Sequence, residues 1–359
     1  MAIPTAIAMA VVVVVGPWVG ARTDHSGRRV PVLVWGTLVT IVATAGLASF
    51  GVPISLGLFV IALIGFNIAG VAYDALLPDV STDETIGRVS GLGVGFGYFG
   101  SVVGFGIGYL LSDILELGSA AVFRALAIAF LLFALPSFFK IVEPERPRRT
   151  DTPPTIRQVF SHLIASWRRA RHVPGVTRFL VGRFLYTDAI NTLTGGFLAI
   201  FATRDMGLTD GQTQLLLIEA VLVAIVGGFI AARLVDRVGP RRYLHAMLWI
   251  WIAALVVGIV AAVTVTTWLA WVLGAAGGIA LGGVWASDRA YMAALTPREV
   301  YGEFYGLYGT VGRFATITGP LLWALVVDGF GADRWVLVAV LTGIVLGARW
   351  ILQGVPRVA

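Results

Sequence analysis

Residues 20–29 read GARTDHSGRR, and a second stretch at 232–242 reads ARLVDRVGPRR. Asp24 and Asp236 are separated by 212 residues, and each is followed by a glycine three residues later and an arginine five residues later, with a second arginine beside it. Each stretch lies between two apolar runs, so each is predicted to be a tight loop between helices, with the glycine at the turn and the aspartate near a helix end. Two such loops in register indicate an internal repeat.

The composition indicates that the chain is a membrane protein. The chain has 359 residues, of which 58% are hydrophobic and 13% charged, with a mean hydropathy of +0.88. Soluble chains have about 45–50% apolar and about 25% charged residues. The absence of cysteine excludes disulfides, thiolate nucleophiles and Cys-ligated metals. The net charge of +6 is interpreted as basic loops that face anionic lipid, and no nucleic-acid partner is expected.

Apolar runs of about 20 residues predict membrane-spanning helices, because backbone polar groups in lipid must be bonded within the segment. Eleven such runs are predicted, at 2–19, 31–50, 54–73, 91–112, 119–139, 178–202, 212–233, 243–263, 267–287, 305–327 and 335–353. The fold class is therefore an all-α polytopic membrane protein.

The basic residues predict the orientation of these spans. Of the 26 lysines and arginines, all but five fall on one side, which is expected to be cytoplasmic. Arg124, Arg204 and Arg334 lie on the other side, and Arg183 and Arg313 lie within spans. The sequence thus predicts a cell-membrane protein whose carboxyl terminus is cytoplasmic and whose amino terminus is outside.

The two halves differ in their number of spans. After the central polar stretch two spans precede Asp236, but only one precedes Asp24, which indicates parallel repeats of five plus six spans with the first of twelve missing. A downstream start at Met1 or a truncated chain is expected, and a natural eleven-span protein is the alternative. The predicted parts are an amino-terminal bundle at 1–140, a linker at 141–177 and a carboxyl-terminal bundle at 178–359.

The linker contains an amphipathic pattern. Apolar residues recur at helical spacing between Ile156 and Trp167, with arginines elsewhere on the helix. This pattern predicts a helix at 155–171 that lies flat on the cytoplasmic face of the membrane, and a calmodulin-like target helix is the less favoured alternative.

Further motifs resemble a known family. The loops at 20–29 and 232–242 are similar to the matched loop signatures of the major facilitator superfamily. Six further stretches resemble the vacuole-effluxer-like (autophagy-related permease) branch of that superfamily. They are YDALLP (73–78), GRVSGLG (87–93), RFLYTD (183–188), the stretch from Gly282 to Arg289, EFYGLY (303–308) and Gly319-Pro320. The resemblance covers nearly the whole chain and implies a permease, with amino-acid efflux as the implied activity.

Ionisable residues within spans are the candidates for a substrate or proton cavity, because a charge there is costly without a function or a partner. Asp188 lies about 15 Å from the inner face, near the midplane. Asp188 or Glu219 would bind a proton or an ammonium group, and Arg183 or Arg313 would bind a carboxylate. The alternative is a static pair such as Asp188–Arg313. The expected cavity residues are Asn67, Tyr73, Asp74, Arg183, Tyr186, Asp188, Asn191, Glu219, Trp285, Asp288 and Arg313.

The repeated loops are expected to gate the transporter on its cytoplasmic side. Asp24 and Asp236 are each predicted to lie near the start of the following helix or near an arginine of a neighbouring one. The expected gating residues are Gly20, Asp24, Gly27, Arg28, Arg29, Asp236, Arg237, Gly239 and Arg241.

The favoured function is secondary active transport of a small solute by alternating access between the two halves, with H⁺ as the candidate coupling ion. The alternative is a degenerate or truncated protein of the same fold that does not transport. No catalytic residue, metal site or cofactor is expected, because the four histidines lack ligand spacing within the spans and the glycines form no phosphate-binding loop. The protein is expected to be a monomer in the lipid bilayer.

Overall fold

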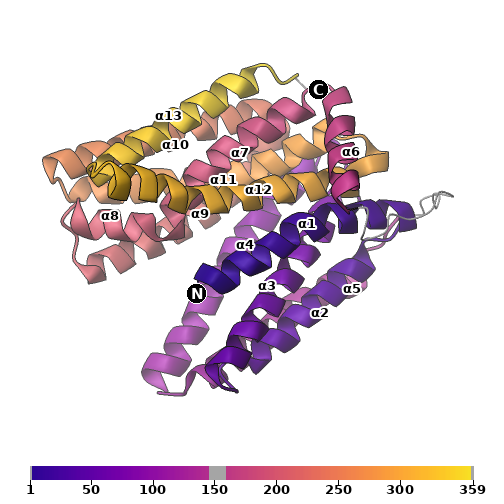
Figure 1. The fold of residues 1–359 in the computed structure, drawn as a ribbon, viewed down its shortest axis with the longest axis horizontal. Helices are drawn as coiled ribbons and strands as arrows, with labels where there is room; N and C mark the ends of the chain where they lie inside the picture. Colours follow the sequence, from indigo (N-terminus) through magenta and orange to yellow (C-terminus); the bar gives the residue numbers. More distant parts are fainter. Residues whose placement is uncertain (1, 145–158, 357–359) are drawn as a thin grey trace. The chain divides into compact units, whose positions relative to one another are not determined.

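The computed structural model describes residues 2–144 and 159–356, and all regular structure within these ranges is helical (Figure 1). The α-helices are α1 (Ala2–Ser26), α2 (Val30–Gly46), α3 (Val52–Ala75), α4 (Ile86–Tyr109), α5 (Ser119–Lys140), α6 (Val159–His172), α7 (Val176–Thr192), α8 (Leu198–Arg204), α9 (Asp210–Val238), α10 (Pro240–Thr264), α11 (Trp268–Leu295), α12 (Tyr301–Trp323) and α13 (Arg334–Gln353).

The prediction of an all-helical, multi-pass membrane protein is confirmed. Within the described ranges, eight helices are long and apolar enough to cross a bilayer, and α2 is apolar but shorter, with 17 residues. The other two predicted spans correspond to α12, with 23 residues, and to the segment that begins with α7. Both contain charged residues of the candidate cavity, Arg183 and Asp188 in α7 and Arg313 in α12.

The prediction of one continuous helix over 178–202 is wrong. Helix α7 ends at Thr192, and a π-helical stretch, Leu193–Phe197, leads into the short helix α8. Within this stretch Gly196 has a φ of 116°, which only glycine adopts readily. Two adjacent glycines therefore break a segment that hydropathy alone predicts as one span.

The described helices group into two compact units, and these differ from a simple division along the chain. The units are Met1–Thr82 with Val102–His172 and Thr296–Thr310, and Asp83–Ser101 with Val173–Leu295 and Val311–Ala359. The first turns of α12 thus belong to the first unit, and the first turns of α4 belong to the second. The predicted division at 140 and 178 stays a prediction.

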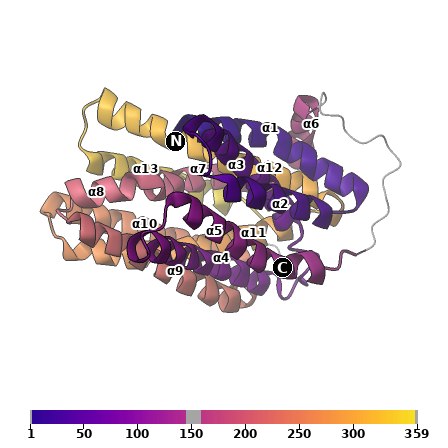
Figure 2. The same cartoon turned by 90° about the horizontal axis from the view of Figure 1, so that it is seen from below.

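In the first unit, α3 packs against α1 and α2, and α2 also packs against α5. Helices α2 and α3 lie side by side in both views (Figures 1 and 2). A Cβ atom added to Gly36 would lie 2.9 Å from the carbonyl oxygen of Gly65, so the two helices approach each other at glycine. Thr40 donates a hydrogen bond to the carbonyl of Ala62 at 3.3 Å. Small residues and a hydroxyl thus form this contact, as is typical of helices packed in lipid.

In the second unit, α11 packs against α9 and α10, and α13 packs against α7 and α10. The contact between α9 and α11 is also made at small residues. A Cβ atom on Gly282 would lie 2.2 Å from the carbonyl oxygen of Ala224, and one on Gly278 would lie 2.5 Å from that of Ala220. Close packing here fixes α11, which carries part of the candidate site.

The repeat extends beyond the two loops. When the 212-residue offset is added to the bounds of α1 to α5, the shifted ranges overlap α9 to α13 in the same order. Residues that occupy corresponding places in the two repeats can therefore be compared directly.

The predicted linker helix is present as α6, which packs against α1 (Figure 1). Residues 155–158, the predicted start, lie outside the described residues. Among the side chains of α6 that the structure describes, Ser166 and Ala170 are buried and Ile164 is exposed. At least one apolar side chain of the predicted stripe is therefore uncovered. Its position on a membrane surface stays a prediction.

Candidate functional site

The carboxylate of Asp24, near the end of α1, binds the first turn of α12. Asp24 accepts hydrogen bonds from the backbone N–H groups of Gly302 at 2.8 Å and Glu303 at 2.7 Å. The first N–H groups of a helix have no partner within the helix and carry its positive dipole end, so a carboxylate is stabilised there. The predicted contact of Asp24 with a helix start is therefore present, although the helix is α12 and not the one that follows the loop.

The guanidinium of Arg29 supports this carboxylate. Arg29 is fully buried and forms ion pairs with Asp24 at 2.8 Å and Asp79 at 3.0 Å. It also donates a hydrogen bond to the carbonyl of Ala75 at 2.8 Å. The carboxylate of Glu143 accepts hydrogen bonds from the backbone N–H groups of Arg29 and of the residue after it. Three acids thus surround one arginine at this end of the first unit.

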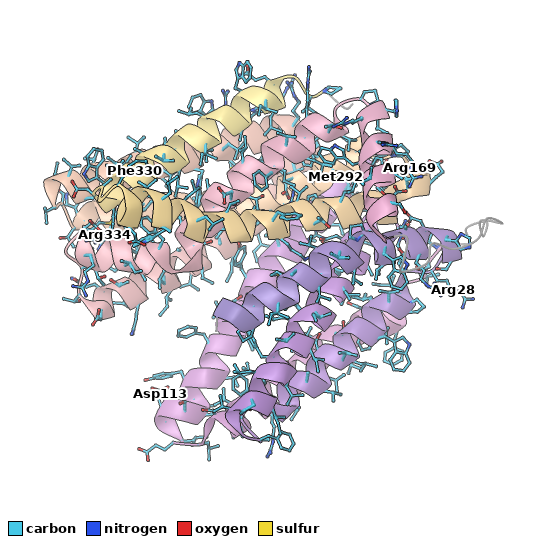
Figure 3. All side chains as sticks on the ribbon, in the orientation of Figure 1. Arg28, Asp113, Arg169, Met292, Phe330 and Arg334 are labelled. Carbon is cyan, nitrogen blue, oxygen red and sulfur yellow. The ribbon has the colours of Figure 1, made fainter. Side chains whose placement is uncertain are left out.

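The linker helix also contacts the first turn of α12. Arg169 of α6, labelled in Figure 3, donates hydrogen bonds to the buried carboxylate of Glu303 at 2.9 and 2.5 Å. Glu303 is therefore bonded through its backbone to Asp24 and through its side chain to Arg169. The start of α12 is fixed from two directions within the first unit.

The second unit repeats the arrangement with Asp236, near the end of α9. Its two carboxylate oxygens accept hydrogen bonds from the backbone N–H groups of Gly87 at 2.6 Å and Arg88 at 2.7 Å, in the first turn of α4. Ser90, one turn further along α4, donates a hydrogen bond to the carbonyl of Ala286 at 2.7 Å. The matched aspartates of the two loops therefore make the same kind of contact.

The loop glycines are required by backbone geometry. Gly27 has a φ of 69° and Gly239 has a φ of 90°, at the ends of α1 and α9, where a left-handed residue commonly terminates a helix. Gly20 is required for a different reason, since an added Cβ would lie 2.1 Å from the carbonyl oxygen of Gly302.

The other arginines predicted as gating residues do not repeat the contacts of Arg29. Arg28 and Arg237 are exposed, and the side chain of neither is bonded to a described residue. Arg241 corresponds to Arg29 in the repeat, but it donates a hydrogen bond to the carbonyl of Gln353 at 2.7 Å.

We expect Asp24→Ala to release the first turn of α12 from α1. The charge-assisted hydrogen bonds that are lost are each worth about 1.5–3 kcal/mol. Spin labels attached at Arg22→Cys and Glu299→Cys report the distance between the end of α1 and the start of α12 by double electron–electron resonance. The chain has no native cysteine that would interfere with labelling. The distance distribution should shift to longer values in Asp24→Ala.

Asp79→Ala is the matched control, because it removes the other ion pair of Arg29 without touching α12. It should leave the measured distances nearly unchanged. An equal shift in both variants, or none in Asp24→Ala, would contradict a specific role for Asp24 in holding the first turn of α12 against α1.

A buried polar cluster joins α7 to α11 in the second unit. Arg183 forms an ion pair with Asp288 at 3.1 Å, and Tyr186 donates a hydrogen bond to the same carboxylate oxygen at 3.2 Å. The exposed fractions of the Arg183 and Asp288 side chains are 6% and 0%. All three were predicted as cavity residues, but the pairing of Arg183 with Asp288 was not foreseen.

Asp188 lies on α7 two residues after Tyr186 and five after Arg183. The side chain of Thr318, on α12, donates a hydrogen bond to the Asp188 carboxylate, which is 4% exposed. In the described part of the chain Asp188 forms no ion pair, so the alternative of a static pair with Arg313 is not observed. An intramembrane carboxylate with one hydroxyl partner is costly as an anion.

The other predicted residues of the second unit are more dispersed. Glu219 of α9 is partly buried beside Gly274 of α11, and its Oε2 atom has no hydrogen-bond partner among the described residues. Asn191 and Arg313 are partly exposed. Trp285 of α11 forms a side-chain hydrogen bond with Tyr98, on α4.

Three predicted cavity residues lie on α3, in the first unit. Asn67 donates a hydrogen bond to the carbonyl of Leu63 in its own helix at 2.8 Å. Tyr73 is exposed and Asp74 is partly exposed near the end of the helix.

Several functional contacts were missed by the sequence analysis. Asp79, Glu143 and Arg169 lie far in sequence from their partners, and no local motif marks them. Thr318 was missed because a lone threonine in an apolar helix gives no signal. In the described ranges no group of three or more His, Asp or Glu side chains is placed to hold a metal ion.

Solved structures of known transporters share this fold. The human organic anion transporter MFSD10 (TETRAN) matches with a TM-score of 0.75 and 18% identity, over 98% of this chain and 83% of that one. The proton:xylose symporter XylE of the major facilitator superfamily matches with a TM-score of 0.74 and 14% identity, over 98% of this chain and 86% of that one. At these identities the likeness concerns the fold alone.

Two curated relatives are similar in sequence. An uncharacterized MFS-type transporter, YxiO of Bacillus subtilis (strain 168), is 27% identical over 98% of this chain and 83% of its own length. Autophagy-related protein 22-2 of Aspergillus clavatus is 22% identical over 71% of this chain. The match covers 46% of that relative, less than half of its length.

The sequence profile of one family matches almost the whole chain. It is described as "Vacuole effluxer Atg22 like" and matches residues 1–354. Members and structural neighbours are transporters of the major facilitator superfamily, which are not enzymes. The chain therefore belongs to the Atg22-like vacuole effluxer family, a branch of the major facilitator superfamily, and is a membrane permease.

Proposed function

We propose that the protein is a secondary active transporter that moves a small amino acid by alternating access between its two halves. The single observation that carries this proposal is the carboxylate of Asp188. It is buried in a membrane helix, it accepts a hydrogen bond from Thr318, and it forms no ion pair in the described ranges. Such a group is stabilised by a proton or by a cationic part of the solute.

The neighbouring charges favour a zwitterionic solute. Asp188 would bind the ammonium group, and Arg313, on the same helix as Thr318, would bind the carboxylate. Five residues of helix separate Arg313 from Thr318, about 7.5 Å along the axis. An α-amino acid carries both an ammonium group for Asp188 and a carboxylate for Arg313.

Proton coupling is the second element of the proposal. Glu219 has a carboxylate oxygen without a hydrogen-bond partner in the described residues, at the contact of α9 with α11. A carboxyl group in such a place can bind a proton in one state and release it in another. We therefore assign H⁺ as the coupling ion and Asp188 or Glu219 as its carrier.

The matched contacts of Asp24 and Asp236 support alternating access. Each binds the first turn of a helix that begins in the other half of the sequence. We propose that the two contacts form when the arginine-rich side is closed. We further propose a monomer in the cell membrane with its carboxyl terminus in the cytoplasm.

The proposal is tested by transport in proteoliposomes that contain the purified chain. Radiolabelled amino acids should accumulate against a gradient when a pH difference is imposed, and a protonophore should abolish the accumulation. Protein-free liposomes are the control. If no amino acid exchanges across the membrane while the protein remains folded, the alternative of a non-transporting member of the fold is favoured.

A further inference from the structure

The repeat reveals a difference in charge between corresponding sites. Arg29 in the first unit is neutralised by Asp24 and Asp79. The residues that correspond to Arg29 and Asp79 at the 212-residue offset are Arg241 and Tyr291. The second unit therefore retains the arginine but has the phenol of Tyr291 in place of the carboxylate of Asp79.

Further substitutions increase the positive charge of the second site. Glu143, which accepts two backbone hydrogen bonds beside Arg29, corresponds to Val355. Leu33 and Ser137 of the first half correspond to His245 and Arg349. Two acids of the first site thus correspond to neutral residues of the second, and one neutral residue corresponds to an arginine.

The side chains gather where α10 and α11 meet the end of α13. Arg241 donates a hydrogen bond to the carbonyl of Gln353 at 2.7 Å, and the hydroxyl of Tyr291 donates one to the carbonyl of Pro356 at 2.8 Å. His245 lies one turn along α10 from Arg241. The Cζ atom of Arg349 lies 4.2 Å above the ring of Trp249.

This cluster has basic groups without an acidic partner. Within the described ranges, neither Arg241 nor Arg349 forms an ion pair with a carboxylate. The Nε atoms of both arginines and Nδ1 of His245 are buried and have no hydrogen-bond partner among the described residues. The carbonyls at the end of α13 satisfy some of the donors, as expected at a helix carboxyl end, but they do not neutralise the charge.

The setting of the cluster indicates the level of the lipid headgroups. Trp249 and Trp350 are exposed on α10 and α13 beside Arg349. Trp350 lies three residues before the end of α13, and an exposed tryptophan at the end of a membrane helix is typical of the membrane–water interface. Basic pockets between helices on the arginine-rich side are suited to phosphate groups of lipids.

We propose that Arg241, His245 and Arg349 form a binding site for the phosphate group of an anionic phospholipid. The phosphate takes the place of the acid that the first repeat supplies internally to Arg29. The acyl chains lie along the exposed apolar surface of α10 and α13 beside Trp249. The site does not depend on the identity of the transported solute.

The test uses the purified, delipidated full chain and measures thermal unfolding together with lipid retention in native mass spectrometry. Phosphatidylglycerol should raise the unfolding temperature by about 3–6 °C relative to phosphatidylcholine. Arg349→Gln should lose this shift and the retained lipid, and Arg349→Lys should keep part of both.

The matched control is Arg334→Gln, at the opposite end of α13, where the arginine already pairs with Asp205 (Figure 3). This variant should keep the full lipid-dependent shift. A second variant, Tyr291→Asp, supplies Arg241 with the acid of the first repeat and should also abolish lipid retention.

Three results would overturn the proposal. Phosphatidylcholine could stabilise the protein as much as phosphatidylglycerol, or Arg349→Gln could keep the full shift in unfolding temperature and the retained lipid. Inorganic phosphate alone could reproduce the shift at millimolar concentration, which would assign the same phosphate-binding chemistry to a soluble ligand and exclude the lipid as its source.

Discussion

Asp188→Asn should abolish concentrative transport and leave the protein folded. The amide can still accept the hydrogen bond from Thr318, but it can neither bind a proton nor neutralise an ammonium group. Losing one partner of a buried charge pair costs several kcal/mol, so the transport rate at low solute concentration should fall by roughly 100-fold or more. Initial uptake rates in proteoliposomes, together with the unfolding temperature of the same preparation, measure both outcomes.

Thr318→Ala is the control for this prediction, since it removes the hydrogen bond to Asp188 and retains the charge. It should keep most of the transport. A stable Asp188→Asn protein with full activity would exclude Asp188 as the central charge and would direct attention to Glu219. A destabilised one would indicate a structural partner for Asp188.

Asp288→Asn should have the largest effect on stability. Asp288 is fully buried, and its removal as an anion leaves the guanidinium of Arg183 in a membrane helix without its charge partner. Breaking a buried ion pair by removing one member costs about 3–5 kcal/mol. Unfolding in a mixed-micelle denaturant titration measures the loss.

Two further variants separate the ion pair from a general effect of charge removal. Arg334→Gln breaks a more exposed pair, with side chains 33% and 15% exposed, and should cost about 0–1 kcal/mol. The double variant Arg183→Met with Asp288→Leu should recover much of the stability, because both charges are then absent. If Asp288→Asn is no less stable than Arg334→Gln, the pair does not hold α7 against α11.

The sequence predicted the helical class and the repeat because both depend on local patterns. Twenty apolar residues can satisfy their backbone in lipid only as a helix, so hydropathy located most of the spans. Asp24 and Asp236, with the glycines that follow them, were identified from their matched spacing. The family resemblance pointed to the same loops and to RFLYTD, which contains Arg183 and Asp188.

The break after Thr192 was not predicted, because the hydropathy of 178–202 is continuous across its two adjacent glycines. The outcome depends on a backbone angle at Gly196 that apolarity does not encode. Hydropathy measures the cost of transfer into lipid, and it does not report the local geometry of the chain.

The choice of partners was decided by the tertiary structure alone. The sequence placed charges at Arg183, Asp188 and Asp288, but only the packing of α7 against α11 and α12 shows that Arg183 pairs with Asp288 and that Asp188 accepts from a threonine. A hydrophobic pattern fixes which residues form a helix and about how deep they lie. The rotation of one helix against another is set by small residues and hydrogen bonds between segments distant in sequence, and this rotation decides which charges meet.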